Sequence, residues 1–138
     1  MIALFTAQRG SADDLAYQAG TCNIGREEIA RRRRAGHSGT IVAVVLLAIL
    51  TLSDAPPAAR LFVALPAAAA AAGYLQASLR FCAAYGFRGL FNLGPLGRVA
   101  KVADVHHAAQ DRARALQIAL AAGGIGLVTG VAAFLLPL

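Results

Sequence analysis

The chain has 138 residues, of which 58% are hydrophobic and only 14% are charged, whereas ordinary soluble domains carry about 25% charged residues. This length allows one compact bundle and excludes a second domain of catalytic size. The net charge of +6 comes from two basic segments outside the apolar ones, which argues against nucleic acid and favours anionic lipid headgroups or other membrane-protein subunits as partners.

Residues 1–22 are expected to form an N-terminal cytoplasmic tail. The apolar run at residues 1–5 is too short for a signal peptide, and two acidic residues, Asp13 and Asp14, follow it. Cys22 does not resemble a lipoprotein anchor, because no long apolar stretch precedes it. A polar terminus is ordered only where something holds it, so we expect the tail to lie against another subunit.

Residues 26–34 predict a short N-terminal interfacial helix on the inner membrane surface. Glu27 and Glu28 lie near its start and four arginines occupy residues 31–34, an order that suits the helix dipole. Asn23 and Gly25 predict a turn before it, and Gly36 would allow a change of direction after it.

Three transmembrane helices are predicted at about residues 37–54, 60–82 and 114–137. Residues 39–53, 61–79 and 115–138 contain no Asp, Glu, Lys or Arg, and about 20 apolar residues cross a bilayer. Pro56 and Pro57 end the first helix, so the first two helices should be antiparallel neighbours. The fold class is therefore an all-α integral membrane protein, with one membrane domain at residues 23–138.

The positive charges predict the orientation. Residues 1–38 carry a net charge of +2 and residues 80–114 a net charge of +4, while the loop between the first two helices is neutral. Lys and Arg near helix ends mark the cytoplasmic side. We therefore expect a multi-pass protein of the bacterial inner membrane, with its N-terminus in the cytoplasm and its C-terminus outside.

Small residues mark helix-packing faces. Alanine fills residues 67–72, and Ala122, Gly126 and Gly130 form a stripe with a four-residue period. Small residues let helices approach closely in lipid. Two alternatives are open for the stripe, packing within the bundle or an interface with another protein. We take these three residues as candidate interface residues.

Residues 83–113 are expected to form a cytoplasmic interfacial loop. Glycine and proline interrupt residues 86–97 too often for a helix, yet the segment is too apolar for a free loop. Asp104 is placed to cap a helix that starts at Val105 and continues into the third transmembrane helix.

Chemically versatile side chains are few. Two cysteines (Cys22 and Cys82) and three histidines (His37, His106 and His107) all fall on the inner side, but none has zinc-type spacing. We therefore expect no cofactor, and haem, pigment or a metal at the three histidines is a minor alternative. Cys82 is the thiol candidate, because Arg80 and Arg88 flank it. No catalytic constellation is evident, so an enzyme is not expected.

Two motifs together resemble a known family. The first motif comprises Asn23, Gly25, Glu28, Arg32 and Gly36, and the second comprises Cys82, Tyr85 and Gly89. Over about residues 23–92 they resemble the small YgaP-type inner-membrane domain, a helical hairpin found alone or beside a rhodanese sulfurtransferase domain. Ile29 and Ala83 depart from the family pattern, and the third helix has no counterpart there. The resemblance implies that the two motifs meet at the inner surface, with Glu28 and Arg32 near Cys82 and Tyr85.

Three functions follow from these observations. The leading hypothesis is a non-catalytic accessory or structural subunit that packs against a larger membrane complex of respiratory or photosynthetic type. The second is a thiol or sulfur-relay membrane protein that uses Cys82. The third is a small oligomeric pore or lipid-interacting protein.

Overall fold

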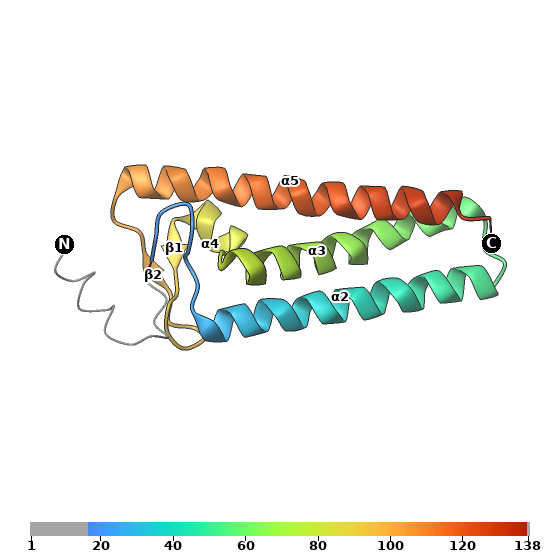
Figure 1. Cartoon of the computed structure of the whole chain (residues 1–138), viewed down its shortest axis with the longest axis horizontal. Helices are drawn as coiled ribbons and strands as arrows, with labels where there is room; N and C mark the ends of the chain where they lie inside the picture. Colours follow the sequence, from blue (N-terminus) through green and yellow to red (C-terminus); the bar gives the residue numbers. More distant parts are fainter. Residues whose placement is uncertain (1–16, 138) are drawn as a thin grey trace. The chain divides into compact units, whose positions relative to one another are not determined.

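The computed structural model describes residues 17–137, and its regular structure is almost entirely helical (Figure 1). In chain order the elements are α2 (Arg26–Leu52), the 3-10 helix η2 (Pro57–Val63), α3 (Ala64–Leu79), α4 (Ala83–Arg88), β1 (Leu90–Phe91), β2 (Ala100–Lys101) and α5 (Val105–Leu135). Three helical stretches are long and apolar enough to cross a membrane: Arg26–Leu52, Pro57–Leu79 and Val105–Leu135. These three stretches support a multi-pass, mainly α-helical membrane protein. The expected contact of the tail with another subunit falls largely on residues 1–16, outside the described residues.

The separate interfacial helix predicted at residues 26–34 is wrong. Its residues form the first turns of α2, which continues unbroken to Leu52. Gly36 lies inside this helix and does not redirect the chain. A Cβ at Gly36 would lie 2.7 Å from the ring of Tyr74, so the glycine here permits a close approach of α3.

The described residues form two compact units. We call residues 17–31 and 76–118 the loop unit, and residues 32–75 and 119–137 the helix unit. α2, α3 and α5 each contribute residues to both units.

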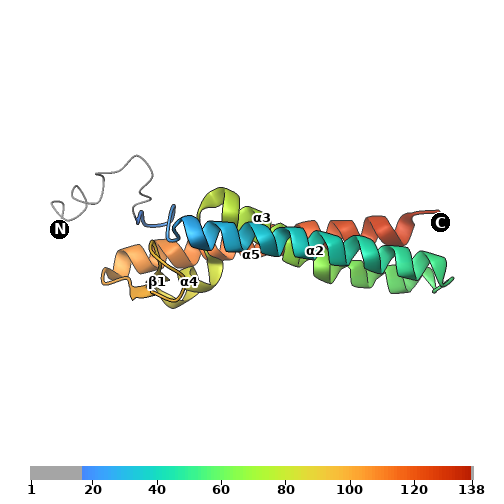
Figure 2. The same cartoon turned by 90° about the horizontal axis from the view of Figure 1, so that it is seen from below.

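In the helix unit, α3 packs against both α2 and α5, and the three helices run along one another in both views (Figures 1 and 2). A Cβ at Gly39 of α2 would lie 2.7 Å from the backbone nitrogen of Ala70 in α3. A Cβ at Gly126 of α5 would lie 2.5 Å from Cβ of Ala68. Such contacts are what hold helices together in lipid, where the hydrophobic effect supplies little drive. The first two helices are antiparallel neighbours, as predicted.

Arg60 lies in η2 and links the beginning of the second membrane-crossing stretch to the end of the third. In the sequence it stands out only as the positive charge of the loop between the first two helices. In the structure Arg60 is 5% exposed, and its Nη1 donates a 2.8 Å hydrogen bond to the carbonyl of Leu136, just past the end of α5. A cation there satisfies a carbonyl that has no partner within the helix and opposes the negative end of the helix dipole.

The loop unit is more regular than the interfacial loop predicted for residues 83–113. α4 carries a glycine where a side chain would not fit, because a Cβ at Gly86 would lie 2.7 Å from the Phe81 ring and 2.9 Å from the carbonyl oxygen of Asp111. Antiparallel β1 and β2 form a minimal sheet. α5 begins at Val105, where the Asp104 carboxylate accepts hydrogen bonds from the backbone N–H groups of His106 and His107. The predicted cap at Asp104 is therefore confirmed.

Candidate functional site

The two sequence motifs meet in the loop unit through Asn23 and Cys82. The Asn23 side chain accepts a 2.6 Å hydrogen bond from the backbone N–H of Cys82 and donates a 3.1 Å bond to the Cys82 carbonyl. The amide thus pairs with the Cys82 backbone as a neighbouring β-strand would. Both residues are fully buried. We call this pair the Asn23–Cys82 clamp.

The backbone around Asn23 extends this pairing to Asn92, the residue that follows β1. The Asn23 carbonyl accepts a 2.9 Å bond from the N–H of Asn92, and the Gly25 N–H donates a 2.8 Å bond to the Asn92 carbonyl. A Cβ at Gly25 would lie 2.4 Å from the Leu93 carbonyl oxygen. The segment is thus extended where the sequence predicts a turn, and glycine is required at residue 25 because the neighbouring backbone is so close.

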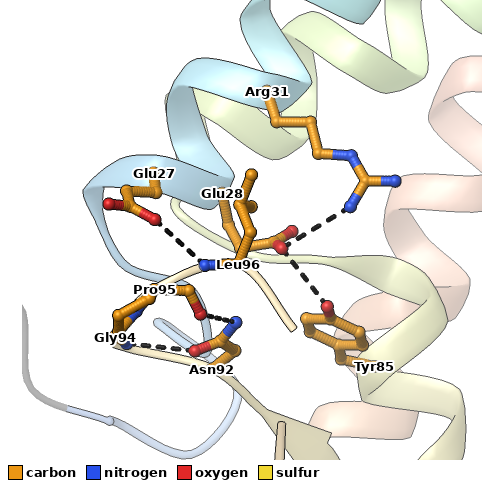
Figure 3. Close-up of polar contacts among 8 residues, drawn as sticks. All are labelled: Glu27, Glu28, Arg31, Tyr85, Asn92, Gly94, Pro95 and Leu96. Atoms are coloured by element: carbon orange, nitrogen blue, oxygen red, sulfur yellow. Dashed lines mark hydrogen bonds and ion pairs between the residues drawn. The ribbon is translucent and has the colours of Figure 1, made fainter. Parts of the chain in front are cut away.

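Glu28 lies at the centre of a second polar cluster (Figure 3). Its carboxylate is fully buried, accepts a 3.4 Å hydrogen bond from the Tyr85 hydroxyl and lies 3.8 Å from Nη1 of Arg31. The structure therefore brings Glu28 to Tyr85, as the resemblance implies. The other two residues of the first motif, Arg32 and Gly36, belong to the helix unit, where their backbone lies close to Gly73.

Asp111 fixes the start of the described chain. Its fully buried carboxylate accepts a 2.6 Å bond from the Tyr17 hydroxyl and a 2.7 Å bond from the Gly20 N–H. The Tyr17 ring also packs on Phe91, with ring centroids 4.9 Å apart. Burial, together with the hydrogen bond to Asp111, raises the pKa of Tyr17 well above its ordinary value. The tyrosine therefore acts as a neutral donor that anchors residues 17–20 to α5.

Neither cysteine is placed as an exposed nucleophile. Cys82 is 0% exposed at the N-cap of α4. Cys22 is 6% exposed, and burial raises the pKa of its thiol even though Arg80 acts in the opposite direction. The raised pKa disfavours the Cys22 thiolate, and burial restricts access to both thiols, whereas sulfur transfer requires an accessible thiolate.

The three histidines are divided between the two units. His37 contacts Tyr74 of the helix unit, its Nδ1 2.7 Å from the tyrosine hydroxyl. His106 and His107 occupy the first turn of α5 in the loop unit. Among residues 17–137, no three His, Cys, Asp or Glu side chains are grouped so that they could hold a metal ion.

The small residues of α5 form two distinct faces. Gly126 and Gly130 pack against Ala68 and Ala64 of α3, and Ala122 is 5% exposed. Within the chain this stripe therefore packs against α3, which is the first of the two alternatives left open by the sequence. A Cβ at either Gly123 or Gly124 would meet no atom within 4 Å.

A shallow groove lies on that second, open face of α5. Its lining is almost wholly apolar and consists of Ala121, Gly124, Ile125, Val128 and Thr129. These residues follow the i, i+3, i+4, i+7, i+8 spacing of one helix face. We call this feature the α5 groove.

Several residues of the loop unit were missed by sequence reasoning. Asp111 looks like an ordinary solvated carboxylate between exposed neighbours on α5, and Asn92 belonged to no predicted site. The partner of Asp111 is distant in sequence, because Tyr17 and Asp111 are 94 positions apart. The weak signal available was composition, because an uncharged amide amid apolar residues, such as Asn92, must find hydrogen-bond partners once it is buried.

Comparison with known proteins found no matching family model, no matching curated protein and no matching solved structure. Inference about function therefore depends on the geometry of this chain.

Proposed function

We propose that the chain is a non-catalytic accessory subunit that packs, through the α5 groove, against a transmembrane helix of a larger membrane complex. The observation that supports this most is the second small-residue face of α5. Within the α5 groove, a Cβ at Gly124 would meet no atom within 4 Å, whereas Gly126 and Gly130 already pack within the bundle. Since small residues in lipid favour close helix approach, an open face of this kind suits a partner helix.

The buried polar groups of the loop unit also support a structural role. Asn23, Asn92 and Asp111 are fully or almost fully buried, and their side chains bind backbone groups or Tyr17. Side chains used in this manner hold segments together. We also retain, as part of the proposal, kinship with the YgaP-type hairpin and an inner-membrane location with the N-terminus inside.

A pair of matched substitutions tests the proposal. Gly124→Leu fills the α5 groove, whereas Gly123→Leu adds the same side chain beside it. In native gels of mildly solubilised membranes, the unaltered chain should migrate with a complex much larger than itself. Gly124→Leu should release it, and Gly123→Leu should leave it bound. Thermal stability of both purified variants should match that of the parent.

Two results would overturn the proposal. One is migration of the unaltered chain as a monomer or as a homo-oligomer, the latter pointing to the pore alternative. The other is full retention of Gly124→Leu in the complex. The thiol-relay alternative predicts instead a persulfide on Cys82 in protein isolated from cells, detectable by mass spectrometry.

A further inference from the structure

Residues 17–22 form a short turn in the loop unit, which we call the strap. The Gln18 carbonyl accepts hydrogen bonds from the N–H groups of Thr21 and Cys22, both at 2.9 Å. The Gln18 N–H returns a 2.9 Å bond to the Cys22 carbonyl. Gly20 supplies the positive φ of 68° that the turn requires. The strap therefore holds its own shape through bonds within itself.

One side chain attaches the strap to the rest of the loop unit. Oδ2 of Asp111 accepts the Tyr17 hydroxyl at 2.6 Å, and Oδ1 accepts the Gly20 N–H at 2.7 Å. Across residues 17–137, no other hydrogen bond joins the strap to a later helix or strand. The Tyr17 ring adds an apolar contact with Phe91. Because both polar bonds end on one carboxylate, loss of either leaves a single bond to hold the whole strap.

The segment that follows the strap is attached more firmly. The Asn23 side chain bonds the Cys82 backbone. Its own N–H donates to the Arg80 carbonyl at 3.1 Å, and its carbonyl accepts the Asn92 N–H at 2.9 Å. These bonds go to separate segments, so no single loss frees them together. Weakly attached parts of a protein open locally while the rest stays folded, and the change from weak to strong attachment falls at Cys22.

Closure of the strap covers a polar and aromatic site on α5 and β1. Tyr17 is 8% exposed, and the Asp111 carboxylate that it bonds is 0% exposed. The centroid of the Tyr17 ring lies 4.9 Å from that of Phe91 and 6.3 Å from that of His107. Ring and hydroxyl belong to one side chain, so all of these contacts are lost together when the strap moves away.

We infer that the strap is a latch that opens as one body at Cys22 while the Asn23–Cys82 clamp stays closed. In the closed state, Tyr17 caps Asp111 and packs on Phe91. In the open state, the carboxylate and the tyrosine hydroxyl both become available to other molecules. The latch concerns the loop unit alone, so it does not depend on the partner helix proposed for the α5 groove.

Amide hydrogen exchange, followed by NMR on the full chain in detergent, tests the latch at single residues. The Gly20 N–H, bonded to Asp111, reports the strap, and the Cys82 N–H, bonded to Asn23, reports the clamp. After correction for intrinsic exchange rates, Gly20 should exchange at least about tenfold faster than Cys82, because the strap opens without the clamp. A Gly20 rate no faster than that of Cys82 would overturn the inference, since the strap would then open only with the rest of the loop unit.

Tyr17→Phe removes the hydroxyl and keeps the ring. It should raise Gly20 exchange about tenfold, because a bond to a charged acceptor is lost, and leave Cys82 exchange within about twofold. Thr21→Ala is the matched control, because it removes an exposed hydroxyl of the same strap, and it should change neither rate. Acceleration of both amides in Tyr17→Phe, or of neither, would overturn the latch.

Gly20→Ala opens the strap by a second route that leaves Tyr17 and Asp111 in place. A side chain at this positive φ is strained, so the N–H at residue 20 should again exchange faster while the Cys82 N–H keeps its parental rate. Loss of Cys82 protection in this variant would show that the strap and the clamp form one unit, which contradicts the latch.

Discussion

Removal of the Asn23 amide tests the clamp between the two motifs. In Asn23→Ala, the buried N–H of Cys82 loses its 2.6 Å acceptor. The Cys82 carbonyl keeps a partner, because the Gly86 N–H also donates to it at 2.9 Å. One buried donor left without a partner costs about 1–3 kcal/mol. We therefore expect a loss of about 2 kcal/mol in the stability of the loop unit.

The reactivity of Cys82 reports this loss directly. Its side chain is 0% exposed, so a maleimide reaches it only when the loop unit opens. If opening and closing are fast, the labelling rate follows the open population, and about 2 kcal/mol corresponds to a roughly thirty-fold increase. A Cys22→Ala background makes the signal specific for Cys82.

Thr21→Ala is the matched control, since Thr21 is exposed and its hydroxyl makes only a 3.5 Å contact with the Ala19 carbonyl. Its effect should stay within about 0.5 kcal/mol, or about twofold in rate. Labelling of Asn23→Ala no faster than that of Thr21→Ala would show that the clamp does not hold the loop unit closed.

Three further results are expected. Gly126→Ala should lower the detergent melting temperature by several degrees, because its Cβ would clash with α3, whereas Gly123→Ala should keep or raise it. Arg60→Met should speed amide exchange in the last turn of α5 roughly tenfold, because the bond to the Leu136 carbonyl is charge-assisted; unchanged exchange would contradict that role. Backbone N–H groups of the first turn of α5 hold the pKa of Asp104 below its ordinary value. Its stabilisation of that turn is thus complete at neutral pH and is lost as the pH falls below about 4. Asp104→Asn should remove this pH dependence of amide protection.

The three membrane-crossing helices were predictable because their signal is local. Long runs without charge and the prolines at residues 56 and 57 suffice to locate them. Gly36 misled the prediction, because a glycine within a helix indicates either a bend or a close contact, and the sequence does not distinguish them. In the structure the Tyr74 ring lies beside Gly36, so this glycine permits a close contact and not a bend.

Most contacts of the loop unit could not be predicted, because they join residues that are far apart in the sequence. The two residues of the Asn23–Cys82 clamp are 59 residues apart, and either residue alone has many other uses. Only the family resemblance suggested that their motifs meet. The buried position of Asp111 had no such hint, because Arg112 beside it made the segment resemble a solvated helix face.

The long separation between Tyr17 and Asp111 also bears on how the protein is made. A ribosome adds about 5–20 residues each second, so the 94 residues added after Tyr17, up to and including Asp111, take roughly 5–20 s to synthesise. During that interval α2 and α3 have already emerged and can enter the membrane, while residues 17–25 still await the segments that will cover them. Assembly of the loop unit is therefore a late, post-insertion step, and a chaperone or nascent partner has several seconds in which to bind its N-terminal segment.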